Sequence, residues 1–219
     1  RCPQTQQQCV LKISRLQPFL GIPLAGFGRF LRNREHKIIR QLQGIQQIPI
    51  LIGTFGRNGL IYKYIEGKSL DEHPVLANNF FFALEKLLGE IHAKDVCYMD
   101  LNKRGNILAG ADDLPYLIDF QISLWLPGKV LGWVRRHLQQ ADYYHLAKHK
   151  KRFRPELMNE MEWEQAKRTC KLIFLHRCVG VPFRYIRRQL LRFLYAKHIL
   201  RPPSDILTSP ENDPRRFLG

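Results

Sequence analysis

Residues 100–120 of the chain read DLNKRGNILAGADDLPYLIDF, and the prediction of the fold starts from this segment. It contains two apolar triplets of β-forming residues, Ile107–Ala109 and Tyr116–Ile118. Between them lies Gly110–Pro115, a segment rich in residues that favour turns. Two short apolar runs on either side of such a segment are typical of a β-hairpin. The sequence therefore predicts an antiparallel hairpin here.

Three oxygen-bearing side chains are predicted to gather around this hairpin. A turn centred between Asp112 and Asp113 would place Asn106 opposite Asp119, with their Cβ atoms about 5 Å apart. Asp100 lies on the loop that leads into the hairpin. Amide and carboxylate oxygens suit Mg²⁺, which takes one or two protein groups and completes its shell with water and phosphate. For each residue taken alone, the alternative is structural: Asp100 and Asn106 shape a turn, and Asp119 caps the next segment.

The same stretch resembles the catalytic loop and the metal-binding Asp-Phe-Gly segment of protein-kinase-like folds. In this resemblance Asp100 takes the place of the catalytic aspartate, Asn106 that of the metal-binding asparagine, and Asp119 that of the aspartate of Asp-Phe-Gly. The interval from Asp100 to Asn106 is one residue longer than the usual protein-kinase spacing and contains basic residues. In this respect it is similar to bacterial lipopolysaccharide-core sugar kinases and RIO-like kinases. Tyr98 stands where kinases usually carry His, and Gln121 replaces the glycine.

The resemblance extends upstream to a lysine and a glutamate. A helix is predicted over residues 29–43, and Glu35 lies on its apolar stripe. The stripe consists of Leu31, Glu35, Ile38 and Leu42. An inward carboxylate needs a cationic partner, and Lys12 on the strand Val10–Ile13 is the candidate. This strand resembles the Val-Ala-Ile-Lys strand, whose lysine holds the α- and β-phosphates of ATP. The alternative is a solvated Lys12 and a different helix register.

A further resemblance concerns nucleotide binding. Residues 62–67, YKYIEG, look like the hinge that joins two lobes and receives the adenine edge, which assigns Lys63 and Tyr64 to nucleotide binding. Kinases carry a Gly-rich loop before the lysine strand, but residues 1–8 contain no glycine. We therefore expect either that this loop precedes residue 1 or that the nucleotide is held differently.

The remaining secondary structure is predicted from periodicity and turn signals. Strands are expected at residues 50–52 and 60–65, separated by a turn. A second helix is expected at residues 78–92, with Phe81, Leu84, Leu88 and Ile91 on its apolar face. The chain beyond residue 126 is predicted to be mainly helical. One helix should start at Asn159, with the side chain of Glu162 reaching back to complete the cap.

The charge of the chain indicates an anionic partner. Lys and Arg number 35 against 19 Asp and Glu, for a formal charge of +16, and residues 129–219 account for +12 of it. A predicted helix over residues 183–200 places Arg184, Arg188 and Arg192 away from its apolar face. This helix is either a packing helix with a solvated face or an interfacial one. The sequence thus leaves open a peripheral contact with an anionic membrane.

Other functional classes are less favoured. Five cysteines without a CxxC pair indicate thiols in a reducing compartment. No uncharged stretch reaches the roughly 20 apolar residues of a spanning helix, so we expect a cytoplasmic protein, with attachment to the inner face of the membrane left open. His145 and His149 have no third ligand nearby for zinc. No RNA-binding motif occurs, which disfavours a nucleic-acid partner.

Together these features predict an α+β chain with a two-lobed protein-kinase-like fold. Residues 1–65 would form a reduced N-lobe, residues 66–201 a mainly helical C-lobe, and residues 202–219 a loose tail. The expected function is ATP- and Mg²⁺-dependent phosphoryl transfer to a hydroxyl. Since no Ala-Pro-Glu segment follows Asp119, the expected acceptor is a sugar or an anionic glycolipid of the lipopolysaccharide-core type, and a protein is the less favoured acceptor. The alternative is a non-catalytic pseudokinase that binds an anionic surface or partner.

Overall fold

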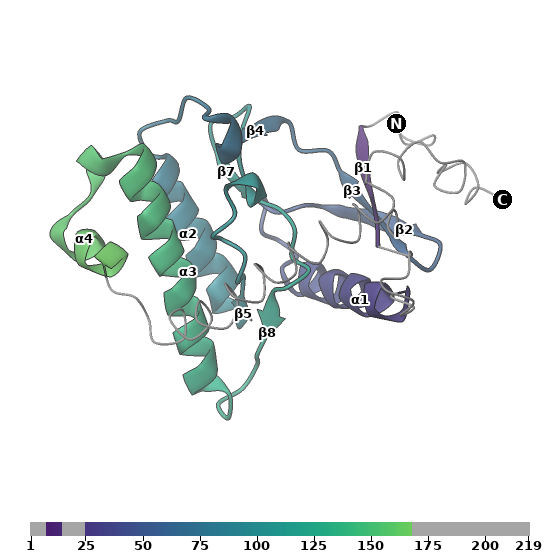
Figure 1. The fold of residues 1–219 in the computed structure, drawn as a ribbon. Helices are drawn as coiled ribbons and strands as arrows, with labels where there is room; N and C mark the ends of the chain where they lie inside the picture. Colours follow the sequence, from purple (N-terminus) through teal and green to yellow (C-terminus); the bar gives the residue numbers. More distant parts are fainter. Residues whose placement is uncertain (1–7, 15–24, 168–219) are drawn as a thin grey trace, which may run out of the picture. The chain divides into compact units, whose positions relative to one another are not determined.

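The computed structural model describes residues 8–14 and 25–167, and Figure 1 shows their arrangement. Within these ranges the chain is α+β, with four α-helices and small antiparallel sheets. The strands are β1 (Cys9–Ile13), β2 (Leu51–Phe55), β3 (Gly59–Lys63), β4 (Gly67–Ser69), β5 (Val96–Cys97), β6 (Ile107–Gly110), β7 (Pro115–Leu117) and β8 (Leu124–Trp125). The α-helices are α1 (Ala25–Gln41), α2 (Phe80–Ala93), α3 (Gly132–Phe153) and α4 (Glu160–Lys167). Short 3₁₀ turns occur at Leu70–Glu72, Arg104–Asn106 and Pro155–Leu157. None of the described helices is long and apolar enough to cross a membrane.

The first sheet contains three antiparallel strands in the order β1-β3-β2. The expected strands at residues 10–13, 50–52 and 60–65 are therefore present, with bounds that differ by a few residues. A turn that includes Gly56, at φ +52°, connects β2 to β3. On the central strand, Leu60 and Tyr62 are buried, and Lys12 lies opposite Leu60 in the register. Because directly paired residues point to the same face of a sheet, Lys12 shares a face with these buried side chains.

Helix α1 packs beside this sheet and begins four residues earlier than the predicted residue 29. Its inward stripe is the expected one, since Glu35 is 2% exposed and Ile38 and Leu42 are also buried. The helix ends at Gln41 and is followed by a turn in which Gly44 has φ +97°. A left-handed backbone at this position suits glycine, which lacks the Cβ that would clash.

The predicted hairpin is present as β6 and β7, but its register differs from the expected one by a residue. Ile107 pairs with Leu117, and the N–H of Ile118 donates to the carbonyl of Asn106 over 3.0 Å. Asn106 therefore lies opposite Ile118. The prediction that it lies opposite Asp119 was wrong.

The length of the hairpin loop explains this shift. The N–H of Gly110 donates to the carbonyl of Leu114, and the N–H of Asp113 donates to the carbonyl of Gly110. Only three residues, centred on Asp112, lie between Gly110 and Leu114. Asp113 has φ +61°, which is typical of a three-residue loop made of a type I turn followed by a left-handed residue. A loop with an odd number of residues has its centre on a residue, here Asp112. The expected centre lay half a residue further along the chain, between Asp112 and Asp113.

Strand β6 also pairs with β4, which anchors the segment that follows β3. A Cβ atom on Gly67 would lie 2.4 Å from the carbonyl oxygen of Ala109, so only glycine allows this close approach of the two backbones.

One core cluster extends from α1 and β3 through α2 to the strands around the hairpin, and Leu146 of α3 packs into it. Its members that are 0% exposed are Leu42, Leu70, Leu84, Leu88, Ile91, Val96, Tyr98, Leu101, Ile107, Leu117 and Phe120. The expected apolar face of α2 is confirmed, since Phe81, Leu84, Leu88 and Ile91 are all buried. The expected cap at Asn159 is also confirmed. Its side-chain Oδ1 accepts from the N–H of Glu162, whose carboxylate accepts from the N–H of Asn159.

The proposed division at residues 65 and 66 falls between β3 and β4. By their contacts, all described residues belong to one unit. The predicted helix at residues 183–200 and the predicted tail at residues 202–219 lie outside the described residues.

Candidate phosphate and metal site

Lys12 connects two acidic side chains from separate parts of the chain. Its ammonium nitrogen lies 2.8 Å from Oε1 of Glu35 and 2.7 Å from Oδ1 of Asp119. Lys12 comes from β1, Glu35 from α1, and Asp119 from the residues directly after β7. The side chain of Lys12 is 28% exposed and that of Asp119 is 33% exposed, whereas Glu35 is buried. The structure thus brings together three residues assigned to nucleotide and metal binding, at a place that solvent can reach.

Glu35 is held in an unfavourable setting for a carboxylate. Burial raises the pKa of Glu35, and the positive charge and hydrogen bond of Lys12 oppose that shift only in part. The nearby phenol of Tyr62 also has a raised pKa, because it is buried and faces the charge of Glu35. The interaction with Tyr62 lowers the pKa of Glu35 less than the charge and hydrogen bond of Lys12 do. Lys12 is consequently the main group that stabilises the charged form of Glu35.

The backbone at Asp119 turns its side chain out of the hairpin. Asp119 has φ +62°, a left-handed conformation that aspartate tolerates better than most residues. The next residue, Phe120, is fully buried and packs edge-on against Tyr98, with ring centroids 5.0 Å apart. The hydroxyl of Tyr98 donates to the carbonyl of Ile118, the residue that precedes Asp119. Tyr98 therefore ties the loop that carries Asp100 to the segment that carries Asp119.

A second cluster forms around Asp100, which is 4% exposed. Its Oδ2 accepts hydrogen bonds from Nζ of Lys103 at 2.6 Å and from Nδ2 of Asn106 at 2.8 Å. Within the described residues, no hydrogen bond is formed by Oδ1 of Asp100, Oδ1 of Asn106 or Oδ2 of Asp119. Each of these side chains thus keeps one oxygen available to a ligand.

Sequence reasoning missed the residue that anchors this loop, Asp142 of α3. Asp142 is 1% exposed, and its carboxylate accepts from the N–H groups of Tyr98 and Met99, each at 2.9 Å. Nε2 of His92 lies 3.0 Å from the same carboxylate. A signal was present in the sequence, because Asp142 is the sole acidic residue between Asp119 and Glu156. A lone carboxylate in such a basic stretch is a candidate for an internal role.

Two further groups fix the flanks of the loop. His149 of α3 is buried, and its Nε2 lies 2.6 Å from the carbonyl oxygen of Leu101. Burial lowers the pKa of His149, which favours the neutral ring with Nε2–H as the donor. On the other side, the hydroxyl of Ser123 donates to the carbonyl of Tyr98, and the guanidinium of Arg34 donates to the carbonyl of Ser123. These contacts connect α1 and α3 to the two ends of the site.

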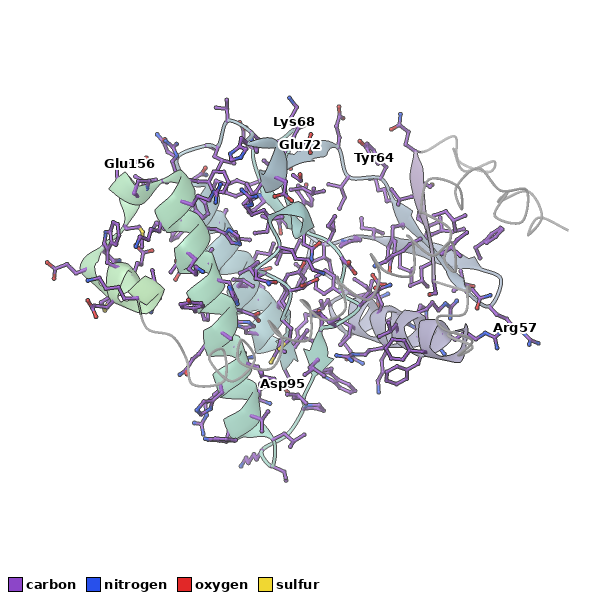
Figure 2. All side chains as sticks on the ribbon, viewed as in Figure 1. Arg57, Tyr64, Lys68, Glu72, Asp95 and Glu156 are labelled. Atoms are coloured by element: carbon purple, nitrogen blue, oxygen red, sulfur yellow. The ribbon has the colours of Figure 1, made fainter. Side chains whose placement is uncertain are left out.

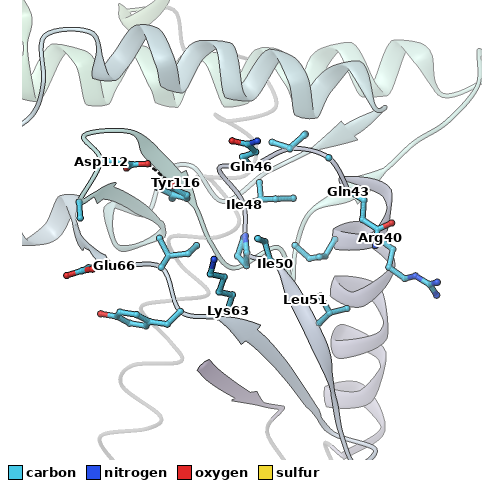
Figure 3. Close-up of a pocket in the computed structure, with 17 residues that line it drawn as sticks. Arg40, Gln43, Gln46, Ile48, Ile50, Leu51, Lys63, Glu66, Asp112 and Tyr116 are labelled. Atoms are coloured by element: carbon cyan, nitrogen blue, oxygen red, sulfur yellow. Dashed lines mark hydrogen bonds between the residues drawn. The ribbon is translucent and has the colours of Figure 1, made fainter. Parts of the chain in front are cut away.

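Lys63 and Tyr64 lie apart from these clusters. Both help to line a cavity of about 760 Å³ beside the end of α1, and Figure 3 shows the side chain of Lys63 directed into it. None of Lys12, Glu35 or Asp119 lines this cavity. Their backbone N–H groups form hydrogen bonds at one end of the first sheet. The N–H of Lys63 donates to the carbonyl of Ile50, and the N–H of Tyr64 donates to the carbonyl of Gln8. Their assignment to nucleotide binding stays a prediction.

The donor set is compatible with Mg²⁺. Within the described part of the chain, no three or more His, Cys, Asp or Glu side chains are grouped closely enough to hold a metal ion. Mg²⁺ does not require such a group, because it is usually bound through one or two carboxylates together with phosphates and water. Asn106 and Asp119 offer two hard oxygen ligands, which matches that requirement. The zinc alternative has little support at His149, whose Nε2 is engaged by a backbone carbonyl.

A scan against protein-family models finds no matching family, and a search of curated proteins finds no match.

Proposed function

We propose that the chain is an ATP- and Mg²⁺-dependent phosphotransferase with a two-lobed protein-kinase-like fold. The observation that carries this proposal is the contact of Lys12 with both Glu35 and Asp119. Asp119 lies 107 residues from Lys12 in the sequence. The resemblance assigned all three residues to the handling of nucleotide phosphates and metal. Their convergence supports a common role, because three unrelated charged residues would gain little from meeting at a partly exposed place.

In this proposal each residue has a separate task. Lys12 holds nucleotide phosphates and is itself positioned by Glu35. Asp119 and Asn106 hold Mg²⁺, which neutralises phosphate charge when bound. Asp100 orients the hydroxyl of the acceptor and accepts its proton. The hydrogen bond from Asn106 and the ion pair with Lys103 fix the orientation of the Asp100 carboxylate, which leaves its second oxygen for the acceptor.

The acceptor is proposed to be a sugar hydroxyl or an anionic glycolipid of the lipopolysaccharide-core type. Only a short segment separates Asp119 from β8 and α3, which leaves little chain for docking an extended peptide. Lys103 lies 2.6 Å from Asp100, and the next residue in the chain, Arg104, pairs with Asp71 at 2.9 Å. These cations favour an acceptor that carries negative charge.

The test separates metal binding from acceptor activation. Asp119→Ala should weaken Mg²⁺-dependent binding of ATP and also abolish turnover. Asp100→Asn should lower turnover by about a hundredfold or more and leave ATP affinity within about twofold, because it removes only the charge that orients the acceptor proton. Glu90→Gln, an exposed carboxylate on α2, serves as the matched control. ATP affinity is measured by calorimetry with and without Mg²⁺, and turnover by phosphate transfer to sugars and lipopolysaccharide-type glycolipids.

The pseudokinase alternative draws on a specific contact. Oδ2 of Asp100 is already engaged by Lys103 and Asn106, which would suit a loop that has lost its catalytic role. This alternative predicts nucleotide binding without transfer to sugars, glycolipids, proteins or water. It also predicts that Asp100→Asn changes nothing beyond stability. If Asp119→Ala binds ATP normally at saturating Mg²⁺, the metal assignment is refuted under both functions.

A further inference from the structure

The segment that joins β8 to α3 presents large apolar side chains to solvent. Val130 is 97% exposed, Trp133 is 63% exposed and Leu131 is 44% exposed. Figure 1 shows this segment as a turn below the start of α3, away from the first sheet. Below, residues 126–136 are called the β8–α3 turn. Three exposed apolar side chains within four residues are unusual for a surface without a partner.

The β8–α3 turn is held in shape by one arginine. The guanidinium of Arg135 donates to the carbonyls of Leu126 and Gly128 and pairs with the carboxylate of Asp95 at 2.8 Å. Gly128 has φ +82°, a conformation that glycine adopts readily. Asp95, labelled in Figure 2, lies at the same end of the molecule as the turn. The turn is thus organised by the contacts of Arg135, and its apolar side chains are not used for this purpose.

The charges around the turn have one sign. Lys129 and Arg136 are exposed and form no ion pair among the described residues. No acidic residue occurs from Phe120 to Ala141, and the carboxylate of Asp95, which contacts the turn through Arg135, is paired with that arginine. The exposed charges of Lys129 and Arg136 are complementary to an anionic surface. They are less complementary to a protein surface that carries charges of both signs.

A second group of exposed aromatic and basic side chains lies on α1. Phe27 and Phe30 are each 58% exposed, and their rings stack at 6.5 Å. Arg34 and Lys37 follow them at helical spacing on the same face. Arg34 donates to the carbonyl of Ile122, and Nζ of Lys37 lies 4.7 Å from the ring centroid of Trp125. These two contacts connect the aromatic and basic face of α1 to the strand that leads into the β8–α3 turn.

We propose that the β8–α3 turn is a membrane-docking site that inserts Val130, Leu131 and Trp133 between the headgroups of an anionic bilayer. Tryptophan favours the boundary between headgroups and acyl chains, and aliphatic side chains beside it gain from burial among the chains. Lys129 and Arg136 then contact the acidic headgroups. This inference gives a definite surface to the membrane contact that the sequence left open, and it does not depend on phosphoryl transfer, since the binding requires neither nucleotide nor acceptor.

The experiment measures sedimentation of the full chain with vesicles in the absence of nucleotide. One set of vesicles is phosphatidylcholine, and the other contains equal parts of phosphatidylcholine and phosphatidylserine. We expect binding to the second set only, weakening as salt is raised. Each of Lys129→Gln and Arg136→Gln should reduce binding about fivefold, because a cation near an anionic surface contributes about 1 kcal/mol. Arg57→Gln and Lys86→Gln, which remove exposed cations elsewhere, are the controls.

The apolar side chains are tested separately. The triple change Val130→Ser, Leu131→Ser and Trp133→Ser should reduce binding at least tenfold. Val75→Ser and Phe82→Ser remove side chains that are 97% and 72% exposed on other parts of the chain, and they should leave binding unchanged. As a local readout, vesicles should shift the tryptophan fluorescence of the parent chain to the blue. Trp133→Phe should lose most of that shift and retain vesicle binding within about twofold, because phenylalanine keeps the apolar ring.

Several outcomes would overturn the proposal. Equal binding to both sets of vesicles would exclude recognition of anionic headgroups. A fluorescence shift that survives Trp133→Phe would place the contact elsewhere. If the triple variant converts a dimer to a monomer without loss of vesicle binding, the turn contacts a second copy of the chain. If that variant instead unfolds at a markedly lower urea concentration, the turn packs against the protein itself.

Discussion

The buried carboxylate of Asp142 should control both stability and the position of the Asp100 loop. Its two oxygens serve three donors: the N–H of Met99 on Oδ1, and the N–H of Tyr98 with Nε2 of His92 on Oδ2. Asp142→Ala would leave two backbone N–H groups buried without partners, at about 1–3 kcal/mol each. The expected loss is about 3–5 kcal/mol, which is a large part of the 5–15 kcal/mol that typically holds a domain together.

Asp142→Asn is the more informative change, because it keeps the shape of the side chain. An amide can accept on one side only, so at least one of the two loop N–H groups loses its acceptor. We expect a loss of about 2 kcal/mol in the free energy of unfolding, measured by urea titration. The amides of Tyr98 and Met99 should also exchange faster with solvent. Glu160→Gln, a carboxylate in the first turn of α4, is the control.

A definite result would refute this reasoning. If Asp142→Asn changes stability by less than about 0.5 kcal/mol, as a surface substitution does, then Asp142 does not anchor the loop. Unchanged exchange at both amides would lead to the same conclusion. If Asp142→Asn lowers the free energy of unfolding but turnover stays normal, Asp142 has a structural role. Its proposed effect on the position of Asp100 would then be refuted.

Two further predictions concern Lys12 and His149. Lys12→Met should weaken ATP binding at least tenfold, and Glu35→Gln should act in the same direction but less strongly, because Lys12 then loses one of its two carboxylate partners; normal ATP affinity of both variants by calorimetry would exclude the pair from nucleotide binding. Burial lowers the pKa of His149 below its usual value of 6.5. Below pH 6.5, His149 therefore binds a proton in the unfolded chain more readily than in the folded chain. The contribution of His149 to the free energy of unfolding should therefore be complete above pH 6.5. It should fall as the pH drops toward the lowered pKa of the folded state, by at most about 1.4 kcal/mol per pH unit. In urea titrations at several pH values, His149→Gln should flatten this dependence on pH.

The sequence predicted the elements around the site because they follow strong local patterns. The apolar stripe on α1 predicted that Glu35 faces inward. Because a buried carboxylate needs a cationic partner, Lys12 could be predicted as that partner. The start of α1 at Ala25 was harder to predict from the sequence. Gly26 and Gly28 are typical of loops, but the helix includes both residues. Local patterns locate an inward residue well, but they fix the ends of an element poorly.

The part of the site that escaped prediction depends on contacts distant in sequence. Asp142 bonds to backbone groups 43 and 44 residues away, and no spacing rule indicates which loop a buried carboxylate serves. The position of Lys63 beside a separate cavity follows from the geometry of its strand. Side chains alternate along a strand, so Lys63 points away from the face that Tyr62 shares with Lys12. A motif assigns a residue to a segment, whereas the strand decides which side it faces.

The register of the β6–β7 hairpin offers a last test, because two loop geometries predict different effects of glycine. In the three-residue loop, Asp113 alone has positive φ, at +61°, and Oδ1 of Asp112 accepts from the N–H of Leu114. Asp113→Gly should then be neutral or stabilise by up to about 1 kcal/mol, since glycine adopts this conformation without strain. Asp112→Gly should destabilise by about 1 kcal/mol, because a turn hydrogen bond is lost. A two-residue loop, which would put Asn106 opposite Asp119, requires positive φ at its first central residue in both favoured turn types, so glycine at position 112 would stabilise it. Urea titration of the two variants decides between them, and stabilisation by Asp112→Gly would refute the observed register.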